Sequence, residues 1–386
     1  MNRWLDIVNY HSSLLADKVR TESYRRAIFE TVRAGDVVLD LGTGTGILAF
    51  FACQAGARRV YAIEKGEVVE AAKEVCLRNG FQDRVIFFNQ PSDRVELPEK
   101  VDVVLTETVG NFGLEEGILG FVIDARQRFL KENGAIIPQS VELFIAPVEL
   151  PESYQTINTW TGDLYGMDFS PIRPFAVNNL YPVILQPKVF LAEPAALSRI
   201  EFSDLKSPDV RNQVSLIAKR RGVMHGIGGW FAVQLTKDIL LSDAPPIMTP
   251  NWSHIFFPLE RPVSLEDGDR LRVAICSADN GGLWRWQVQV DGKPDSGGHL
   301  PERKARFDHS TFLGFPLSKE RLRKEASNYA PKLSRRGEAA LFLLRSFDGE
   351  KTISELEREL LHQHPDCFRS LQEASMFVRK MVTRST

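Results

Sequence analysis

The chain has 386 residues, of which 43% are hydrophobic and 25% are charged, a composition typical of a globular protein. At roughly 150 residues per domain, this length predicts two or three domains. Lys and Arg total 48 and Asp and Glu total 50, so the formal net charge of −2 excludes the strongly basic class of dedicated nucleic-acid binders.

Membrane proteins and disulfide scaffolds are also excluded. No apolar run approaches the roughly 20 residues that cross a bilayer. The N-terminal segment has no signal-peptide h-region, so we expect a cytoplasmic protein that binds neither membrane nor nucleic acid. The four cysteines lie far apart without CxxC pairing, which argues against a disulfide framework and a cysteine-rich metal site. We therefore expect no bound metal.

The N-terminal third alternates helix-like and strand-like segments. After about 30 helical residues, apolar strands such as DVVLDLG, RVYAIEK and VDVVLTET are separated by helices such as VVEAAKEVCLRNG. Continuous Val, Ile and Leu strands with helices between them predict a parallel sheet covered on both faces. We predict an α/β fold here, a Rossmann-like domain over residues 1–137.

The next segment, residues 138–297, is β-rich. Short runs such as SVELFIAPVEL, RLRVAIC and WRWQVQV are separated by turn signals such as Asp267-Gly268. These runs predict an antiparallel sandwich or barrel. One aromatic, irregular stretch, INTWTGDLYGMDFSPIRPF, is expected to leave the β body as an excursion.

Residues 298–386 are richer in charge and in helix formers, and they predict a mainly helical module. The segment EAALFLLRSFDGEKTISELERELLHQHP predicts two helices joined by a turn at Asp348-Gly349. Thr352 stands three residues before Glu355, the spacing of a helix N-cap.

The sharpest local signal follows the first strand. Asp40 is followed by glycines at alternate positions, Gly42, Gly44 and Gly46, which let the backbone approach a ligand and turn into a helix. Glu64 ends the second strand, where a carboxylate can accept both ribose hydroxyls. Dinucleotide sites prefer G-x-G-x-x-G, whereas this spacing after an acid favours S-adenosylmethionine (SAM), with Asp40 near its amino-acid end. An ordinary strand-to-helix turn is the third interpretation.

A second signal follows the fourth predicted strand. Glu107 ends that strand and Glu116 lies nine residues later, so two carboxylates flank one loop beside the glycine-rich turn. Converging carboxylates suit a planar cation with several N–H donors, and a guanidinium is the obvious one. The alternative is that Glu115 and Glu116 only begin a solvated helix, where acidic residues are favoured.

These motifs in order resemble the protein arginine methyltransferase family. LADKVRTESYRRAIF resembles its N-terminal helix, VVLDLGTGTGILAFFACQAGARRVYAIEK its SAM motif, and TETVGNFGLEE its double-glutamate loop. WTGDLYGMDFSPI is similar to its dimerisation arm, at about 152–185, and PNWSHIFFPL to its Thr-His-Trp loop. The similarity spans roughly residues 11–290. It implies a Rossmann-like SAM-binding domain, then an antiparallel β-barrel with a helical dimerisation arm.

The resemblance also implies a role for particular residues. It implies that Arg20 pairs with the SAM carboxylate, Glu64 with the ribose and Asp93 with the adenine amino group. The three glycines would line the cofactor, and Glu107 and Glu116 would hold the guanidinium of the substrate. The implied function is N-methylation of an arginine in a peptide or protein by a homodimer that uses SAM.

Departures from the family pattern lie on the substrate side. The Tyr-Phe-x-x-Tyr pattern before His11 is missing, and the histidine of the Thr-His-Trp loop is Asn251, although Trp252 is retained. The loop Met and Tyr are Val109 and Asn111. Three alternatives therefore stay open: methylation of another nucleophile, methylation of free arginine or another small guanidine, and a SAM-binding inactive scaffold.

The C-terminal segment has no place in that family. LSRRGEAALFLLRSFDGEKTISELERELLHQHP and SLQEASMFVRKMV resemble the helical half of PqqD-like domains, which hold the leader segment of ribosomal peptide precursors. If so, a leader peptide is a partner and would raise the local concentration of its core peptide at the active site. The alternative is a helical cap that packs on the rest of the protein or on a second subunit.

Overall fold

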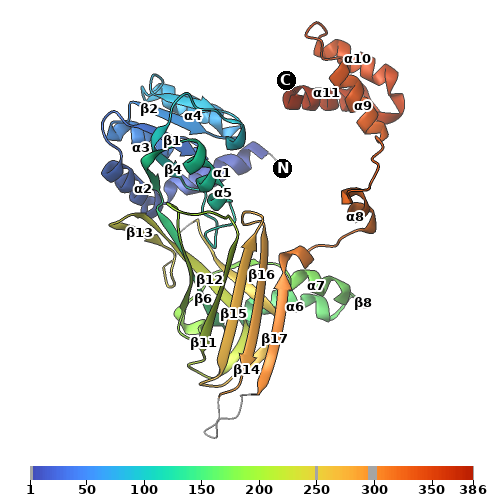
Figure 1. Cartoon of the computed structure of the whole chain (residues 1–386). Coiled ribbons are helices and arrows are strands. Elements are labelled where there is room, and N and C mark those ends of the chain that lie inside the picture. Colours follow the sequence, from blue (N-terminus) through green and yellow to red (C-terminus); the bar gives the residue numbers. More distant parts are fainter. Residues whose placement is uncertain (1–2, 248–250, 294–301, 386) are drawn as a thin grey trace. The chain divides into compact units, whose positions relative to one another are not determined.

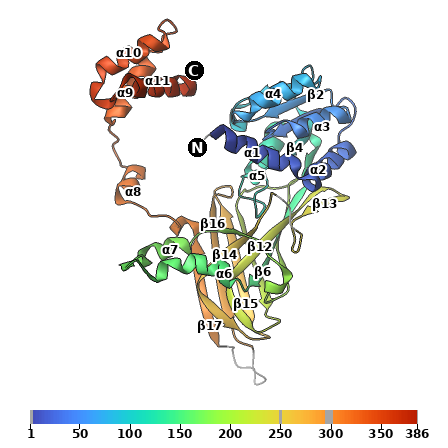
Figure 2. The same ribbon diagram turned by 180° about the vertical axis from the view of Figure 1, so that it is seen from behind.

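The computed structural model of the chain describes residues 3–247, 251–293 and 302–385. It divides into two compact units, Met1–Pro316 and Leu317–Thr386, shown in Figures 1 and 2. The predicted boundary after residue 297 is therefore too early. Strand β17 (Arg303–Ser310) pairs with β16 (Leu283–Asp291) along its length, so these residues belong to the first unit.

The first part of this unit is a five-stranded parallel sheet with the strand order β3-β2-β1-β4-β5. The three central strands, β2, β1 and β4, are largely buried as the sequence predicts, and all five residues of β1 are buried. The strands are β1 (Val37–Leu41), β2 (Arg59–Ile63), β3 (Val85–Phe88), β4 (Val101–Thr106) and β5 (Leu130–Ile137). The helices of this part are α1 (Arg3–Ala16), α2 (Lys18–Thr31), α3 (Ile47–Ala55), α4 (Val68–Arg78) and α5 (Ile118–Arg128).

The order of these strands locates the ligand edge of the sheet. The chain runs outward from β1 through β2 to β3, and then returns to the other side of β1 as β4. Open α/β sheets bind ligands at this switch point, beyond the carboxyl ends of the strands. The glycine turn after β1 and the loop after β4 both lie there, which brings the two predicted motifs together.

The β-rich part contains two antiparallel sheets, of six and four strands. The larger sheet contains β6 (Ser140–Val148), β9 (Tyr181–Val183), β10 (Ala195–Glu201), β12 (Gly222–Thr236), β13 (Ile239–Ser242) and β14 (His254–Leu265). The smaller contains β11 (Val210–Ile217), β15 (Arg270–Ala278), β16 and β17. Strands such as β15 and β16 alternate buried and more exposed residues, because their inner faces form a shared apolar core.

The aromatic stretch after β6 does leave the β body. It contains α6 (Pro151–Asn158), the short pair β7 (Asp163–Leu164) and β8 (Met167–Asp168), and α7 (Arg173–Ala176) (Figure 1). A separate apolar cluster that includes Tyr154, Ile157 and Trp230 anchors this segment on the larger sheet. Its tip is solvent-exposed, and Tyr165 is 95% accessible.

The second unit is helical in the residues that the structure describes. It contains α8 (Lys319–Glu325), α9 (Arg335–Arg345), α10 (Ile353–Gln363) and α11 (Leu371–Ser385). The last three surround their own small core, which includes Leu343, Leu360 and Val378. The predicted N-cap of α10 is confirmed: Thr352 and Glu355 form a capping box. None of the described helices is long and apolar enough to cross a membrane.

Candidate active site

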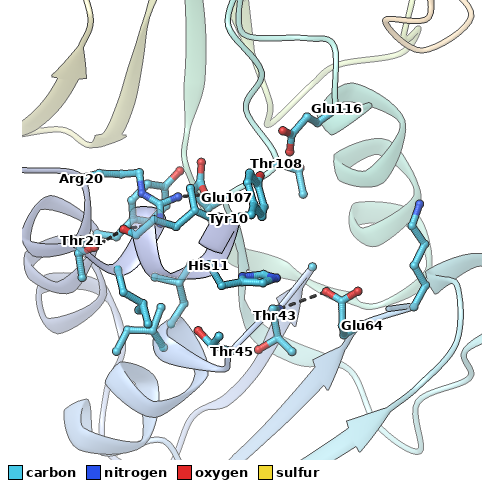
Figure 3. Close-up of a pocket in the computed structure, with 18 residues that line it drawn as sticks. Tyr10, His11, Arg20, Thr21, Thr43, Thr45, Glu64, Glu107, Thr108 and Glu116 are labelled. Carbon is cyan, nitrogen blue, oxygen red and sulfur yellow. Dashed lines mark hydrogen bonds and ion pairs between the residues drawn. The ribbon is translucent and has the colours of Figure 1, made fainter. Parts of the chain in front are cut away.

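Two cavities adjoin at the carboxyl edge of the parallel sheet. The first, of about 320 Å³, is lined by α1, the start of α2, the glycine turn and the loop after β4 (Figure 3). The second, of about 450 Å³, lies toward β3 and α5. Gly42 and Lys65 line both cavities, so the two form neighbouring parts of one site.

The glycine turn is built from left-handed backbone. Gly42, Gly44 and Gly46 have φ of +74°, +54° and +90°, which residues with a Cβ rarely adopt. Asp40 is completely buried behind the turn and braces it, because its Oδ2 accepts from Thr43 Oγ1 at 2.5 Å and from Ala49 N at 3.1 Å. Burial raises the pKa of Asp40 to about 7. Asp40 and Gly46 themselves do not line either cavity.

Glu64 and Asp93 lie in different parts of this site. Glu64 lines the first cavity, and its carboxylate bridges two loops by accepting from Gly44 N at 3.2 Å and from Gly66 N at 2.6 Å. Asp93 lies on the exposed wall of the second cavity. The structure thus brings both predicted nucleoside contacts to the same edge of the sheet.

Arg20 forms an ion pair with Glu107, which the sequence did not predict. Arg20 Nη1 donates to Glu107 Oε2, and both side chains are at least 85% buried. Arg20 Nη2 donates to Leu14 O at 3.1 Å, and Nε is buried with no partner among the described residues. Burial raises the pKa of Glu107 to about 7, although the Arg20 charge opposes this shift.

The second glutamate of the loop is Glu116 rather than its neighbour. Glu116 lines the first cavity, and its carboxylate accepts no hydrogen bond from the described residues. Glu115 turns into its own loop, where it accepts from Phe112 N at 2.8 Å and from Leu114 N at 3.1 Å. The nine-residue spacing therefore selects the carboxylate that faces the cavity. Burial raises the pKa of Glu116 as well.

Asn251 and Trp252 line neither cavity, and their hydrogen bonds support the segments that surround the cavities. Asn251 Nδ2 donates to Ser13 O at 3.0 Å and to Asp17 Oδ2 at 3.1 Å, which ties the α1–α2 junction to this loop. Trp252 is buried and donates from Nε1 to Val109 O at 3.1 Å, beneath the double-glutamate loop. Both residues thus support segments that surround the cavities, and their place on the substrate side stays a prediction.

Sequence reasoning missed several residues that line the site, among them Tyr10, Thr108 and Asn280. Tyr10 lies on α1 between the two glutamates in Figure 3, and burial together with the charges of Glu116 and Glu107 raises its pKa. Thr108 lines the first cavity, and Asn280 lines the second. Only Thr108 had a signal, its position directly after Glu107; Tyr10 and Asn280 match no motif.

The residues present fit SAM. The unpaired, buried Arg20 Nε suits a carboxylate, and the Glu64 carboxylate suits hydroxyl groups. The turn has no room for side chains, because a Cβ on Gly44 would lie 2.9 Å from His11 Cε1. No group of three or more His, Cys, Asp or Glu side chains that could hold a metal occurs in the described part of the chain.

Replacing Gly44 with Ala is expected to weaken the binding of S-adenosylhomocysteine about tenfold. The left-handed backbone costs an L-residue roughly 1–2 kcal/mol, and the new Cβ displaces His11 from the cavity wall. Isothermal titration calorimetry measures the change. Gly80→Ala is the matched control, because Gly80 has φ of +72° with nothing within 4 Å of its Cβ and lies outside both cavities. Equal affinity of the two variants contradicts the prediction.

Comparisons with known proteins cover both parts of the first unit. The family model of the arginine methyltransferase oligomerization subdomain matches residues 139–287. The model of ribosomal protein L11 methyltransferase (PrmA) matches residues 21–138. Neither match reaches the C-terminal unit.

Relatives and solved structures agree with these matches. Protein arginine N-methyltransferase 6 of Xenopus laevis is 34% identical over 275 residues, which are 67% of this chain and 80% of that protein. The Trypanosoma brucei PRMT1 enzyme-prozyme heterotetrameric complex with AdoHcy has a TM-score of 0.69 at 25% identity, over 78% of this chain and 97% of that chain. Arabidopsis thaliana protein arginine methyltransferase 10 has a TM-score of 0.68 at 25% identity, over 79% and 99%.

Proposed function

Because this chain belongs to the protein arginine N-methyltransferase family, we propose that it transfers a methyl group from SAM to a guanidinium nitrogen of an arginine in a protein or peptide. The observation that carries this proposal is the pair of carboxylates in the first cavity. Glu107 and Glu116 both face the space beside the glycine turn (Figure 3). Glu107 already holds a guanidinium, that of Arg20.

The cofactor residues are those that line the two cavities. Arg20 would hold the SAM carboxylate through its free Nε, Glu64 the ribose and Asp93 the adenine, with Gly42 and Gly44 against the cofactor. Asp40 and Gly46 act one step away, by fixing the turn. When bound, SAM supplies an electrophilic methyl group on a sulfonium, from which S-adenosylhomocysteine would leave as a neutral thioether.

The carboxylates address the weakness of the nucleophile. A guanidinium reacts poorly because its lone pairs are delocalised, and ionised Glu107 and Glu116 would hold its charge away from the reacting nitrogen. Glu107 is already paired with Arg20, whereas Glu116 accepts no hydrogen bond from the described residues. Glu116 is therefore the better placed of the two to take the proton that the guanidinium loses.

Incubation with isotope-labelled SAM tests the proposal. Mass spectrometry of arginine-containing peptides and of free arginine is expected to place the label on guanidinium nitrogens of peptides. Label on free arginine alone would identify the small-guanidine alternative. Label on another residue type, or none despite cofactor binding, contradicts arginine methylation and favours a different nucleophile or a scaffold.

We also propose a homodimer joined through the excursion that contains α6 and α7. This segment is anchored at its base by the cluster around Tyr154, while its tip exposes Tyr165, Met167 and Ile172. It lies inside the match to the oligomerization subdomain. Light scattering after size exclusion measures the molar mass in solution, which is expected to be that of two chains. The cytoplasmic location stays a prediction.

For the C-terminal unit, we propose that α9–α11 hold a leader segment of the peptide substrate. The support is the small independent core of this unit, which suits a docking module that is tethered to the enzyme. A tethered module raises the effective concentration of its ligand at the active site, and it lowers the KM of a leader-bearing peptide without changing the chemical step.

Removal of the C-terminal unit tests the proposal that this unit holds a leader segment. A chain that ends at Pro316 retains the parallel sheet and all the antiparallel sheets of the first unit. It is expected to show a KM for a leader-bearing peptide raised by about 10²-fold, with kcat unchanged. The same peptide without its leader is the control, and its KM is expected to be equal for both chains. If the truncation leaves the KM of the leader-bearing peptide unchanged, the unit is a cap and the leader proposal is wrong.

A further inference from the structure

The tip of the β15–β16 hairpin lies in the wall of the second cavity, although it belongs to the smaller antiparallel sheet. Asp279 and Asn280 both have φ of +52°, and Gly281 follows with φ of +88°. Two consecutive left-handed residues other than glycine are uncommon, and such backbone persists where surrounding contacts hold it.

The tip fits a socket between α5 and the double-glutamate loop. Asn280 Oδ1 accepts from Gly120 N at 2.8 Å, one of the first-turn N–H groups that lack a partner within a helix. A Cβ on Gly120 would lie 2.5 Å from Asn280 Nδ2. A Cβ on Gly281 would lie 2.1 Å from Leu114 O, in the loop that carries Glu116. Both glycines are needed for this close approach.

The two polar atoms of the Asn280 amide, Oδ1 and Nδ2, differ in what they contact. Its Nδ2 donates to none of the described residues, and Asn280 lines the second cavity together with Asp93, Gly120 and Phe121. Asp124 lines the same cavity, but it is engaged by Arg128 at 2.5 and 2.6 Å. With respect to the described residues, the wall thus offers an unengaged acceptor at Asp93 and an unengaged amide donor at Asn280. Adenine presents the complementary set, an exocyclic amine and ring nitrogens that accept.

We propose that Asn280 is a cofactor-binding residue, which donates from Nδ2 to a ring nitrogen of the adenine while its Oδ1 keeps the hairpin on α5. This inference rests on the proposed function, because it takes the second cavity as the nucleoside site. It makes the antiparallel part of the first unit a direct contributor to cofactor recognition. Through Gly281 and Leu114, the same hairpin tip supports the loop of Glu116.

The test compares Asn280→Asp, Asn280→Gly and wild type in the full chain. Asn280→Asp keeps an oxygen for Gly120 N–H and loses the donor, whereas Asn280→Gly loses the donor without adding charge. The dissociation constants of adenosine and S-adenosylhomocysteine, measured by calorimetry, are expected to rise about tenfold in both variants. The thermal unfolding midpoint of Asn280→Asp is expected to stay at or above that of wild type, because a carboxylate at a helix N-terminus is favourable.

Asp279→Asn is the matched control. Asp279 is the exposed neighbour of Asn280 in the same hairpin tip, and Asp279 itself lines neither cavity. Its replacement is therefore expected to leave both dissociation constants unchanged. Wild-type affinity for adenosine in Asn280→Asp overturns the inference and leaves Asn280 a purely structural residue. Failure of the wild type to bind either ligand overturns the proposed function, and the inference with it, so the two failures are distinct.

Discussion

Glu116→Gln is expected to lower the kcat of methyl transfer about 10²- to 10³-fold, with the affinity for S-adenosylhomocysteine unchanged. The amide keeps the size of the side chain but removes the charge that polarises the guanidinium and the site that accepts its proton. Because the native carboxylate accepts no hydrogen bond from the described residues, its loss breaks no contact that holds the fold. Single-turnover kinetics with a labelled methyl donor measure the chemical step, and calorimetry measures the affinity.

Glu115→Gln provides the contrast. The Glu115 carboxylate accepts backbone N–H bonds within the loop and does not line the first cavity. Its loss is therefore expected to lower the thermal unfolding midpoint. At a temperature where the variant is folded, its kcat is expected to stay close to that of wild type. A protein in which Glu116→Gln retains full turnover is not a guanidinium methyltransferase that uses this loop. A similar loss in both variants would mean that the loop, and not one carboxylate, limits the reaction.

Glu107→Gln is expected to impair both turnover and cofactor binding, unlike Glu116→Gln. The native carboxylate holds Arg20, and Arg20 is the residue that we propose for the SAM carboxylate. An amide pairs with Arg20 only weakly, so the Arg20 guanidinium is no longer held in place for the SAM carboxylate. The difference between the two glutamates therefore follows from their neighbours and not from their chemistry.

Much of this site followed from local patterns in the sequence. The strand ends, the glycine turn and the two loop carboxylates obey rules that act within a few residues, and the switch point of a parallel sheet then brings them together. The choice of Glu116 over Glu115 came from the family resemblance, because the double-glutamate loop of that family has the same nine-residue separation. The parallel sheet and the capping box of Thr352 also follow from short-range signals.

The parts that could not be predicted depend on contacts between distant segments. Arg20 and Glu107 are 87 residues apart, and Gly120 and Asn280 are 160 apart. The brace formed by Trp252 and the pairing of β17 with β16 are likewise decided by tertiary packing. The charged alternation of RKARFDHS resembles a solvated segment until a neighbouring strand buries Ala305, Phe307 and His309.

Between about pH 6 and pH 8, activity and stability are expected to change in opposite directions. The pKa of Glu107 is about 7, and only the ionised carboxylate attracts a guanidinium, so kcat/KM is expected to rise about tenfold per pH unit below pH 7 and to level off above it. Initial rates at a saturating concentration of SAM, with a short arginine peptide well below its KM, measure this profile.

The stability trend has the other sign. Burial raises the pKa of Glu107 and Asp40 to about 7 and that of Asp243 to about 8, all above their values in the unfolded chain. The folded state therefore binds these protons more tightly. Their contribution to the free energy of unfolding is full below the unfolded pKa values of about 4, and it is lost progressively as the pH rises from there to the folded values of about 7 to about 8. The urea midpoint is expected to be lower at pH 8 than at pH 6.

Asp243→Asn separates the two effects. Asp243 is buried away from both cavities; its Oδ1 accepts from Phe231 N at 3.0 Å, and its Oδ2 has no partner among the described residues. The amide keeps the accepting oxygen and removes the titrating proton, so the fall of the urea midpoint is expected to shrink while the activity profile stays the same. A rate that is flat from pH 6 to pH 8 would show that the Glu107 carboxylate does not control the reaction. An activity profile that moves with Asp243→Asn would assign that control to the fold, because this residue touches neither cavity.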